Sequence, residues 1–352
     1  MHQAILYKKL DNKKVQCTAC RQNCIISQNN IGICGVRQNK NGKLYLLVYG
    51  KASSFNIDPI EKKPLYHFMP STEIFSLGTV GCNFSCNFCQ NWDISQVTKH
   101  LKNKLLKKKK IADIDVEISK LGYSLPPKKI VEICIEKNIQ SIAYTYNEPG
   151  IFFEYAYDTA KLANKKGIKN VFVTNGYETE EALQLIKPYL NAMNIDLKSF
   201  NDEFYKKLCK AKLQPVLDTI KLAHKLGIWI EITTLIIPEK NDSDAELKKI
   251  ANFISNIDQN IPWHIIAFHP DYKMKDIPST SLDALDKAYN IGKKSGLNYV
   301  YSGNIHNDKH SNTYCLKCKT LLIKRHGYFT NIENLKSGKC LNCSEKIAGV
   351  WK

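Results

Sequence analysis

The chain has 352 residues, enough for one catalytic domain of barrel size with one or two small modules attached. Its formal charge of +18 comes mostly from lysines scattered along the sequence, which is typical of ordinary solvated surfaces, so we expect no nucleic-acid partner. Because it has no run of about 18 apolar residues and no signal-peptide pattern, we expect a cytoplasmic protein without a membrane partner.

Thirteen cysteines are present, and in a cytoplasmic chain this number favours metal binding over disulfides. Cys134 and Cys209 stand alone in helix-like patterns, and we expect both to be buried apolar side chains. The others form three groups: Cys17, Cys20, Cys24 and Cys34; Cys82, Cys86 and Cys89; and Cys315, Cys318, Cys340 and Cys343.

The first cysteine group lies within residues 1–50, a region with few long apolar runs, and it predicts a small module organised by a metal. Four cysteines with the spacing C-x2-C-x3-C-x9-C can hold either a structural zinc ion or an auxiliary iron–sulfur cluster that passes electrons. Gly32 and Gly35 suit a tight wrap around either metal. We slightly favour zinc at this group.

From about Glu73 to Ser302, within the expected domain of residues 51–310, short β-rich runs alternate with helical patterns, which predicts parallel βαβ units in an α/β domain. Helical spacing of apolar residues is clear in 151–166, closed by Gly167, and in 216–226, closed by Gly227. The expected strands are 74–80, 141–146, 170–175, 192–197, 229–237, 263–268 and 299–302.

Polar residues follow most of these strands, at the edge of a parallel sheet where catalytic groups gather. Structural polar residues need not coincide in this way, so we expect an active site at the carboxyl ends of the strands. The residues concerned are Gly81 and Cys82, Asn147 and Glu148, Asn175 and Gly176, Asp196 and Lys198, and His269.

The run GTVGCNFSCNFCQNW places Cys82, Cys86 and Cys89 directly after the first of these strands, with the spacing C-x3-C-x2-C. Four thiolates satisfy all the irons of a four-iron cluster, whereas three leave one iron open to a substrate or cofactor. This group therefore predicts a catalytic iron–sulfur cluster.

A zinc ion with a remote fourth ligand, His67 or His100, is the alternative at the same three cysteines. Aromatic residues interleave with the cysteines, and we expect Phe84, Phe88 and Trp92 to shield the metal from water. The spacing alone does not exclude zinc, and this pattern and the position of the loop after the first strand favour the cluster only together with the family resemblance given below.

Residues 311–352 contain two C-x2-C pairs about twenty residues apart. They bracket the stretch LLIKRHGY, which predicts a hairpin. Such paired knuckles are typical of zinc ribbons, in which a short chain needs the metal to fold. A single rubredoxin-like iron is the alternative, and with either metal we expect a structural or substrate-docking role.

The C-x3-C-x2-C motif resembles that of the radical S-adenosylmethionine (SAM) superfamily. The longer run DPIEKKPLYHF (58–68) followed by GTVGCNFSCNFCQNW resembles AmmeMemoRadiSam-system radical SAM enzymes, relatives of pyruvate formate-lyase activating enzyme, over nearly the whole chain. The resemblance implies a partial parallel (βα)6 TIM-like barrel in residues 51–310, flanked by the two cysteine-rich modules. It also implies a [4Fe-4S] cluster on Cys82, Cys86 and Cys89, whose open iron binds SAM.

Further residues are assigned to SAM through the same resemblance. Thr145, Asn147 and Glu148 lie where relatives have a Gly-Gly-Glu stretch that binds the amino group of SAM, although Tyr146 and Asn147 replace the glycines. The Asp-Leu-Lys stretch of Asp196 and Lys198, the strand-end residue Asn175, and the late-strand His269 complete the expected cofactor-binding set.

The resemblance implies reductive cleavage of SAM to a 5′-deoxyadenosyl radical, which abstracts hydrogen from a substrate. A reductant such as ferredoxin or flavodoxin is then a required partner. The substrate is either a partner protein, as in glycyl-radical activating enzymes, or another molecule, and the sequence does not choose. The alternative from another class is a non-catalytic metal-binding adaptor that binds nucleic acid through its basic surface and zinc ribbon.

Overall fold

The computed structural model of the protein describes residues 1–108, 110–305 and 309–351. It divides into two compact units. The first contains Met1–Ile57, Ile74–Asn191 and Cys209–Ala211, and the second contains Asp58–Glu73, Ala192–Leu208 and Lys212–Lys352. Within the described residues, no helix is long and apolar enough to cross a membrane.

A parallel arrangement of three strands forms the centre of the first unit, with β11 (Ser141–Tyr144) between β9 (Glu73–Gly78) and β12 (Lys169–Thr174). Every residue of β11 is buried, as expected for a strand covered on both faces. The helices α4 (Pro127–Glu136) and α5 (Phe153–Asn164) pack together, and α5 also packs against β12. The strand ends of β9, β11 and β12 therefore lie side by side.

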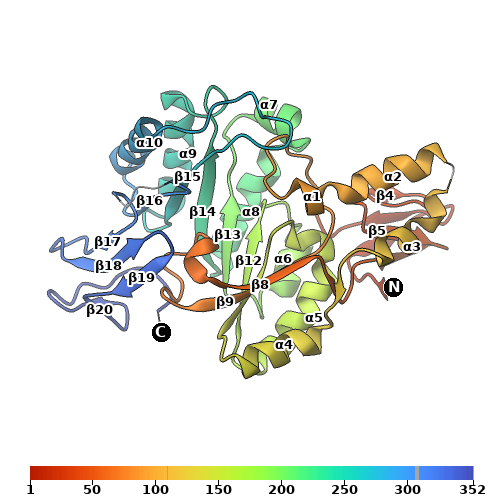
Figure 1. The fold of residues 1–352 in the computed structure, drawn as a ribbon, viewed down its shortest axis with the longest axis horizontal. Helices are drawn as coiled ribbons and strands as arrows, with labels where there is room; N and C mark the ends of the chain where they lie inside the picture. Colours follow the sequence, from red (N-terminus) through yellow and green to blue (C-terminus); the bar gives the residue numbers. More distant parts are fainter. Residues whose placement is uncertain (109, 306–308, 352) are drawn as a thin grey trace. The chain divides into compact units, whose positions relative to one another are not determined.

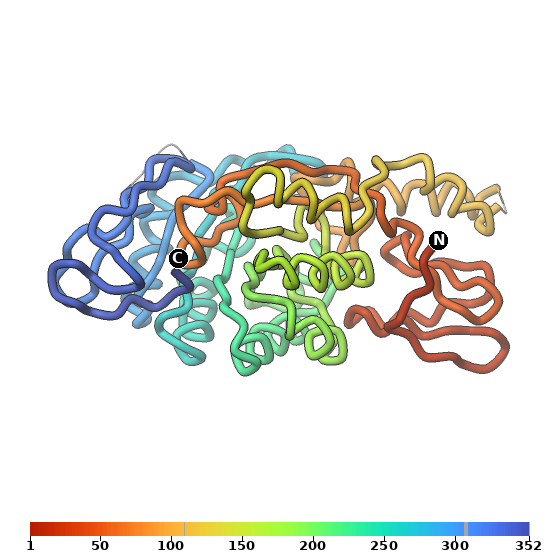
Figure 2. The backbone as a smooth tube through the Cα atoms, turned by 90° about the horizontal axis from the view of Figure 1, so that it is seen from below, coloured from red at the N-terminus to blue at the C-terminus, as the bar shows by residue number. Residues whose placement is uncertain are grey.

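Short antiparallel strands make up the N-terminal part of the first unit, with the sheet orders β2-β3-β4 and β1-β6-β5. Figures 1 and 2 show that α2 and α3 lie beside them. The strands of these two sheets are β1 (His2–Gln3), β2 (Tyr7–Lys9), β3 (Val15–Cys17), β4 (Ile25–Ile26), β5 (Arg37–Lys40) and β6 (Lys43–Leu46). The next two strands lie outside them: β7 (Lys51–Ala52) pairs with β10, and β8 (Ser54–Pro59) is the neighbour of β9. The remaining elements of this unit are α1 (Trp92–Ser95), α2 (Val97–Lys107), α3 (Ile114–Ser119), β10 (Tyr123–Ser124) and α6 (Glu180–Ile186).

Four parallel strands in the order β13-β14-β15-β16 form the centre of the second unit. Helices α9 and α10 pack together, and α10 packs against β15 and β16 (Figure 1). The strands are β13 (Ala192–Asp196), β14 (Trp229–Ile236), β15 (Trp263–Ala267) and β16 (Val300–Gly303). The helices are α7 (Asp202–Phe204), α8 (Gln214–Lys225), α9 (Asp244–Ile257) and α10 (Leu282–Lys294).

The C-terminal part of the second unit is a small β module. Its hairpin of β18 and β19 confirms the hairpin expected in LLIKRHGY. Leu322, Ile323 and Ile347 pack with Tyr299 and Tyr301 in one buried cluster, so this module shares its core with β16. The strands are β17 (Thr313–Tyr314), β18 (Leu321–His326), β19 (Phe329–Ile332), β20 (Leu335–Lys336) and β21 (Lys339–Cys340).

The expected α/β class is confirmed, and each of the seven expected strands is present to within two residues at either end. Gly167 and Gly227 end their helices with positive φ angles of 74° and 72°, as the sequence indicated. Cys134 and Cys209 are fully buried, as expected. The described strands of each unit do not close into a barrel, and a sixfold βα barrel stays a prediction.

Candidate metal and cofactor site

Cys82, Cys86 and Cys89 lie on the loop between β9 and α1, in the first unit. Cys82 and Cys86 are buried. Phe84, between these two cysteines, and Phe88, between Cys86 and Cys89, are buried as well, as expected for rings that shield the loop from water. Trp92 does not share this role, because 41% of its surface is exposed. It opens the short helix α1 at the surface instead.

Hydrogen-bond donors face the sulfur of Cys82. The backbone N–H of Phe84 lies 3.4 Å from Sγ, and the amide of Asn175 lies 3.9 Å away. Burial raises the pKa of the Cys82 thiol, and the ammonium of Lys99 lowers it. A buried thiolate needs a cation to compensate its charge, so this loop is suited to a bound metal rather than to free thiolates.

Asn147 holds the start of the cysteine loop in place. Its side-chain amide donates to the carbonyl oxygen of Gly81 at 2.8 Å and to the hydroxyl of Thr79 at 3.1 Å, and its oxygen accepts from the N–H of Thr79. Tyr146 has a positive φ of 66°, a conformation that glycine adopts without strain. The tyrosine therefore adopts a left-handed backbone conformation at a position where the resembling stretch has glycine. Thr145 is buried beside it, and its N–H donates to the carbonyl of Leu77.

Glu148 is completely buried, and its carboxylate accepts hydrogen bonds from protein groups. The N–H of Gly150 lies 2.9 Å from Oε1 and the N–H of Asn175 lies 2.8 Å from Oε2, while the hydroxyl of Thr174 reaches both oxygens. Glu148 thus caps the helical turn Pro149–Phe152 and fixes the backbone of Asn175. Contact between Glu148 and the amino group of SAM stays a prediction.

Glu178 is a second buried carboxyl group beside this network, and the sequence analysis did not single it out. Its Oε1 lies 2.6 Å from the hydroxyl of Thr174, which Glu148 also uses. Burial and the neighbouring Glu178 raise the pKa of Glu148, and burial raises that of Glu178. Two carboxylates this close favour a shared proton. The position of Glu178 just after a strand, near Asn175 and Gly176, was the sequence feature that could have identified it as a candidate site residue.

Asp196, Lys198 and His269 lie in the second unit. The ammonium of Lys198 lies 2.7 Å from Asp196 Oδ2, and both side chains are only partly exposed. His269 is exposed, and its Nε2 lies 3.1 Å from the carbonyl oxygen of Asn304. Asp196 is the last residue of β13, Lys198 lies just beyond it, and His269 follows β15, as expected. Their contact with SAM stays a prediction.

His67 is excluded as a metal ligand by its hydrogen bonds. Its Nδ1 lies 2.7 Å from the carbonyl oxygen of Ala348, and its Nε2 lies 2.6 Å from the hydroxyl of Tyr301. Both ring nitrogens are therefore used within the protein. His100, the other candidate for a zinc ligand, is an exposed residue of α2.

The four C-terminal cysteines form a compact group in the second unit. All four sulfur atoms lie within 4.8 Å of one another, with Cys315 3.5 Å from Cys343 and Cys318 3.6 Å from Cys340. Metal–sulfur bonds of about 2.3 Å in a tetrahedral zinc site place sulfurs about 3.8 Å apart. The spacing therefore fits a single tetrahedral metal ion.

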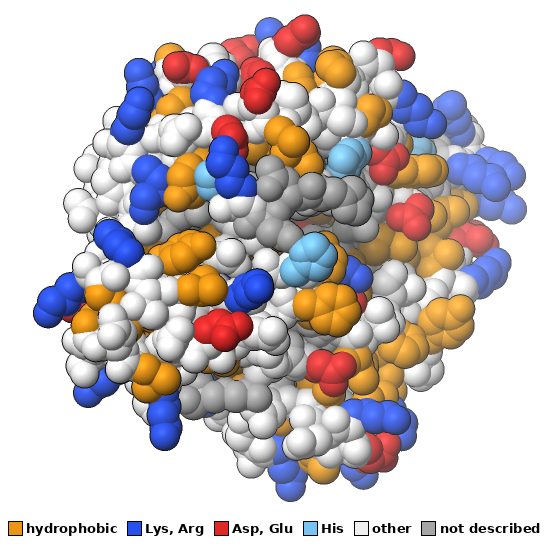
Figure 3. Space-filling model, turned by 60° about the vertical axis from the view of Figure 1, so that its left-hand side comes forward, with side chains coloured by type: hydrophobic (Ala, Val, Ile, Leu, Met, Phe, Trp, Pro, Cys, Tyr) orange, Lys and Arg blue, Asp and Glu red, His pale blue; other side chains and the backbone are white. Residues whose placement is uncertain are grey.

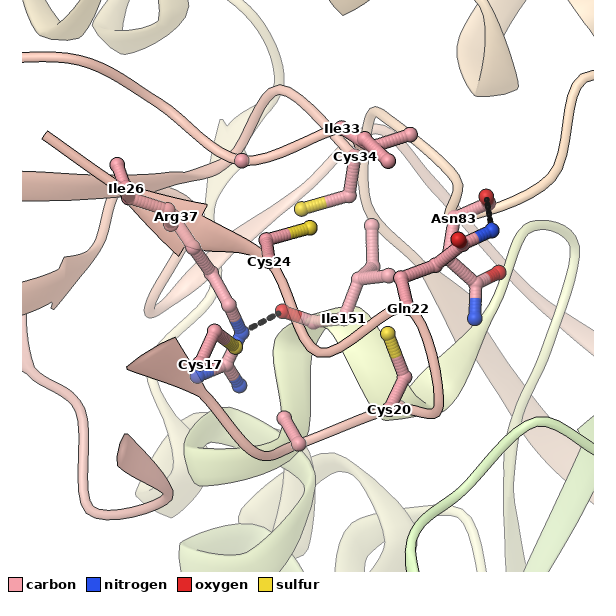
Figure 4. Close-up of a pocket in the computed structure, with 13 residues that line it drawn as sticks. Cys17, Cys20, Gln22, Cys24, Ile26, Ile33, Cys34, Arg37, Asn83 and Ile151 are labelled. Carbon is pink, nitrogen blue, oxygen red and sulfur yellow. Dashed lines mark hydrogen bonds between the residues drawn. The ribbon is translucent and has the colours of Figure 1, made fainter. Parts of the chain in front are cut away.

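The four N-terminal cysteines line one cavity in the first unit (Figure 4). Cys17 ends β3, Cys20 and Cys24 lie in the turn before β4, and Cys34 lies before β5. The turn is joined to the loop after β12, where the N–H of Arg21 donates to the carbonyl of Tyr177 at 2.8 Å. This module therefore contacts the segment that carries Asn175 and Glu178.

Known proteins that resemble the chain include curated sequences and solved structures. An uncharacterized protein of Methanocaldococcus jannaschii is 44% identical over 351 residues, which cover 99% of each chain. A pyruvate formate-lyase-activating enzyme of Clostridium pasteurianum is 24% identical over 221 residues, covering 59% of this chain and 82% of that enzyme. The crystal structure of a radical SAM methyltransferase from Sphaerobacter thermophilus aligns with a TM-score of 0.49 and 14% identity over 68% of each chain.

The family description "Radical SAM superfamily" matches residues 76–254. This range begins in β9, includes the loop of Cys82, Cys86 and Cys89, and ends within α9. It spans just over half of the 352 residues. The chain therefore belongs to the radical SAM superfamily.

Proposed function

We propose that the chain binds a [4Fe-4S] cluster through Cys82, Cys86 and Cys89 and uses it to cleave SAM reductively. Membership of the superfamily implies an enzyme with such a cluster and with SAM as its cofactor. The observation that carries the assignment to this loop is its set of three thiols after β9, with donors directed at Cys82. When bound, the cluster supplies the electron that splits SAM into methionine and a 5′-deoxyadenosyl radical, which takes hydrogen from the substrate.

The neighbouring residues of the first unit prepare this site. Phe84 and Phe88 exclude water, which protects a reactive radical from side reactions. Asn147 fixes the backbone of the cysteine loop through Gly81. Glu148 fixes Asn175, whose amide donates to the side chain of Asn83 at 2.8 Å and faces Cys82.

Thr145, Asn147, Glu148 and Asn175 remain our candidates for contact with SAM in the first unit. In the second unit the candidates are Asp196, Lys198 and His269. The ammonium of Lys198 suits the carboxylate of SAM, and Asp196 suits its amino or ribose hydroxyl groups. His269 is exposed and can meet a ligand without first losing a buried contact.

A partner protein is the substrate that we favour. The support is the relative from Clostridium pasteurianum, whose name gives pyruvate formate-lyase, itself a protein, as its target. A one-electron reductant of the ferredoxin or flavodoxin class would supply the electrons. The face in Figure 3 shows lysines and arginines dispersed among acidic and apolar side chains, so it offers no support for the nucleic-acid adaptor.

The C-terminal cysteines are proposed to hold a structural zinc ion. The support is the spacing of their sulfur atoms and the small core of the module, which a metal would complete. A docking role for the partner protein is compatible with the same arrangement.

Transfer of deuterium tests the substrate class. The reconstituted protein is incubated anaerobically with SAM, a reductant, and extract from cells grown in deuterated medium, separated into macromolecular and small-molecule fractions. We expect 5′-deoxyadenosine that has gained deuterium with the macromolecular fraction only, and none with Cys86→Ala. Gain of deuterium with the small-molecule fraction alone would contradict a protein substrate.

A further inference from the structure

The N-terminal cysteines differ from the C-terminal ones in how their sulfur atoms are spaced. Among the residues that the structure describes, the C-terminal set is the one that brings three or more metal-binding atoms within 4.8 Å of one another. Figure 4 shows the side chains of Cys17, Cys20, Cys24 and Cys34 placed around a common space. The two sets have the same ligands but hold them at different separations.

This difference bears on which metal each set can hold. A single zinc ion needs all four sulfurs about 3.8 Å apart, because each bond is about 2.3 Å long. In a four-iron cluster each thiolate binds a different iron, so the sulfurs stand farther apart around a larger body. The N-terminal set, which the structure describes in full, does not bring three sulfurs within 4.8 Å of one another, so its spacing fits a cluster better than a single zinc ion.

Apart from the four thiols, the cavity is lined mainly by buried and apolar side chains. Cys17, Cys20 and Cys34 are buried, and Ile26, Ile33 and Ile151 are among the apolar side chains that line the space. Arg37 also lines it and is held by Glu154, with two nitrogen–oxygen distances of 2.6 and 3.1 Å. This ion pair is the same whichever metal is bound, so the sulfur spacing decides between them.

The cavity lies next to the loop of the central cysteines in the same unit. Asn83, the residue after Cys82, lines the cavity, and its carbonyl oxygen accepts from the amide of Gln22 at 3.0 Å. A Cβ placed on Gly81 would lie 2.6 Å from the carbonyl oxygen of Cys34, which shows how closely the two backbones approach. The two cysteine sets are therefore separated by little more than the chain that carries them.

We propose that Cys17, Cys20, Cys24 and Cys34 hold a second [4Fe-4S] cluster, with a thiolate on every iron, in place of the zinc ion that the sequence favoured. A cluster without an open iron binds no SAM, so its chemistry is confined to accepting and donating single electrons. The second cluster would lie beside the central cysteines, whose own cluster needs an electron to cleave SAM.

Iron analysis of a variant without the central cluster tests this proposal. In full-length protein with Cys82→Ala, Cys86→Ala and Cys89→Ala, reconstituted anaerobically, we expect about four iron and four sulfide per chain and one zinc. Adding Cys20→Ala and Cys24→Ala should remove that iron, whereas adding Cys134→Ala, a buried thiol outside all three sets, should not. Two zinc ions and no iron in the first variant would overturn the proposal.

The unsubstituted protein gives a second measurement if the multiple variant does not fold. We expect about eight iron per chain, and SAM should change the electron paramagnetic resonance signal of one reduced cluster and leave the other unchanged. About four iron with two zinc ions per chain would overturn the proposal.

Discussion

His67 is a buried histidine whose ring is held neutral by its surroundings. Burial lowers its pKa from the ordinary value of 6.5 to about 4, against the opposing effect of Glu231. Since Nδ1 faces a carbonyl oxygen, it carries the proton, and Nε2 accepts from Tyr301. The same arrangement that excludes His67 as a ligand makes it sensitive to acid.

The pH dependence of stability follows from this lowered pKa. Below pH 6.5 His67 is protonated in the unfolded chain, whereas in the folded protein it stays neutral down to about pH 4. The stability that neutral His67 contributes to the folded state is therefore lost as the pH falls from 6.5 to about 4. The free energy of unfolding should decrease by up to about 3 kcal/mol. We expect the melting temperature to fall from pH 7 to pH 5 less steeply in His67→Asn than in the unsubstituted protein. Parallel curves would show that His67 does not titrate in this way.

Glu148 distinguishes a structural carboxyl group from one that binds SAM. Glu148→Ala leaves the buried N–H groups of Gly150 and Asn175 without acceptors, at a cost of about 1–3 kcal/mol for each. We therefore expect a lower melting temperature with unchanged iron content. Glu148→Gln keeps an acceptor oxygen and should melt closer to the unsubstituted protein.

Titration of SAM into both Glu148 variants completes the comparison. If the carboxylate also holds the amino group of SAM, Glu148→Gln should bind SAM at least about tenfold more weakly despite its stability. Normal affinity in Glu148→Gln would remove Glu148 from the contacts with SAM and leave the helix cap as its role.

At the scale of elements, the cysteine loop depends on a glycine at its start. Gly81 has a φ of 95°, and a Cβ there would meet the carbonyl oxygen of Cys34 at 2.6 Å. Gly227 has a φ of 72° but nothing within 4 Å of the same position. A side chain at Gly227 would therefore cause backbone strain alone, whereas one at Gly81 would cause backbone strain and a steric clash.

Alanine at these two glycines should have different effects. Gly227→Ala should cost about 1–2 kcal/mol of stability and leave the iron content unchanged. Gly81→Ala must also displace the backbone of Cys34 or of the central loop, so we expect loss of iron as well as stability. Equal iron content in the two variants, measured after anaerobic reconstitution, would contradict a close fit between these segments.

Periodicity in the sequence predicted the elements well, because continuous apolar runs and helix-ending glycines report local structure. The strand expected at 141–146 ends at Tyr144, since Tyr146 turns back with a positive φ, and β9 ends at Gly78 rather than at 80. These shortened ends are where Asn147 and the cysteine loop begin. Residues such as Val80 and Tyr146, whose side chains suggested strand, therefore belong to the loops of the candidate site.

At the scale of the whole molecule, the cysteine groups and their order were visible in the sequence, and the radical SAM motif was sufficient to indicate the family. The distances between sulfur atoms could not be predicted from the sequence, because the spacing of cysteines along the chain is similar for zinc and for a cluster. The partnership of Glu148 with Thr174 and Glu178 was also hidden, since it joins residues on separate strand ends. The sulfur distances and the contacts of Glu148 both depend on how segments distant in the sequence pack together.

The central claim is that the three cysteines after β9 support cleavage of SAM, and the most direct test is the yield of 5′-deoxyadenosine. Protein reconstituted without oxygen is incubated with SAM and a strong reductant, and the nucleoside is measured by mass spectrometry. We predict accumulation of 5′-deoxyadenosine and methionine with the unsubstituted protein and none with Cys86→Ala, while Cys134→Ala behaves as the unsubstituted protein. No 5′-deoxyadenosine from fully iron-loaded protein, or an equal yield from Cys86→Ala, would contradict the account.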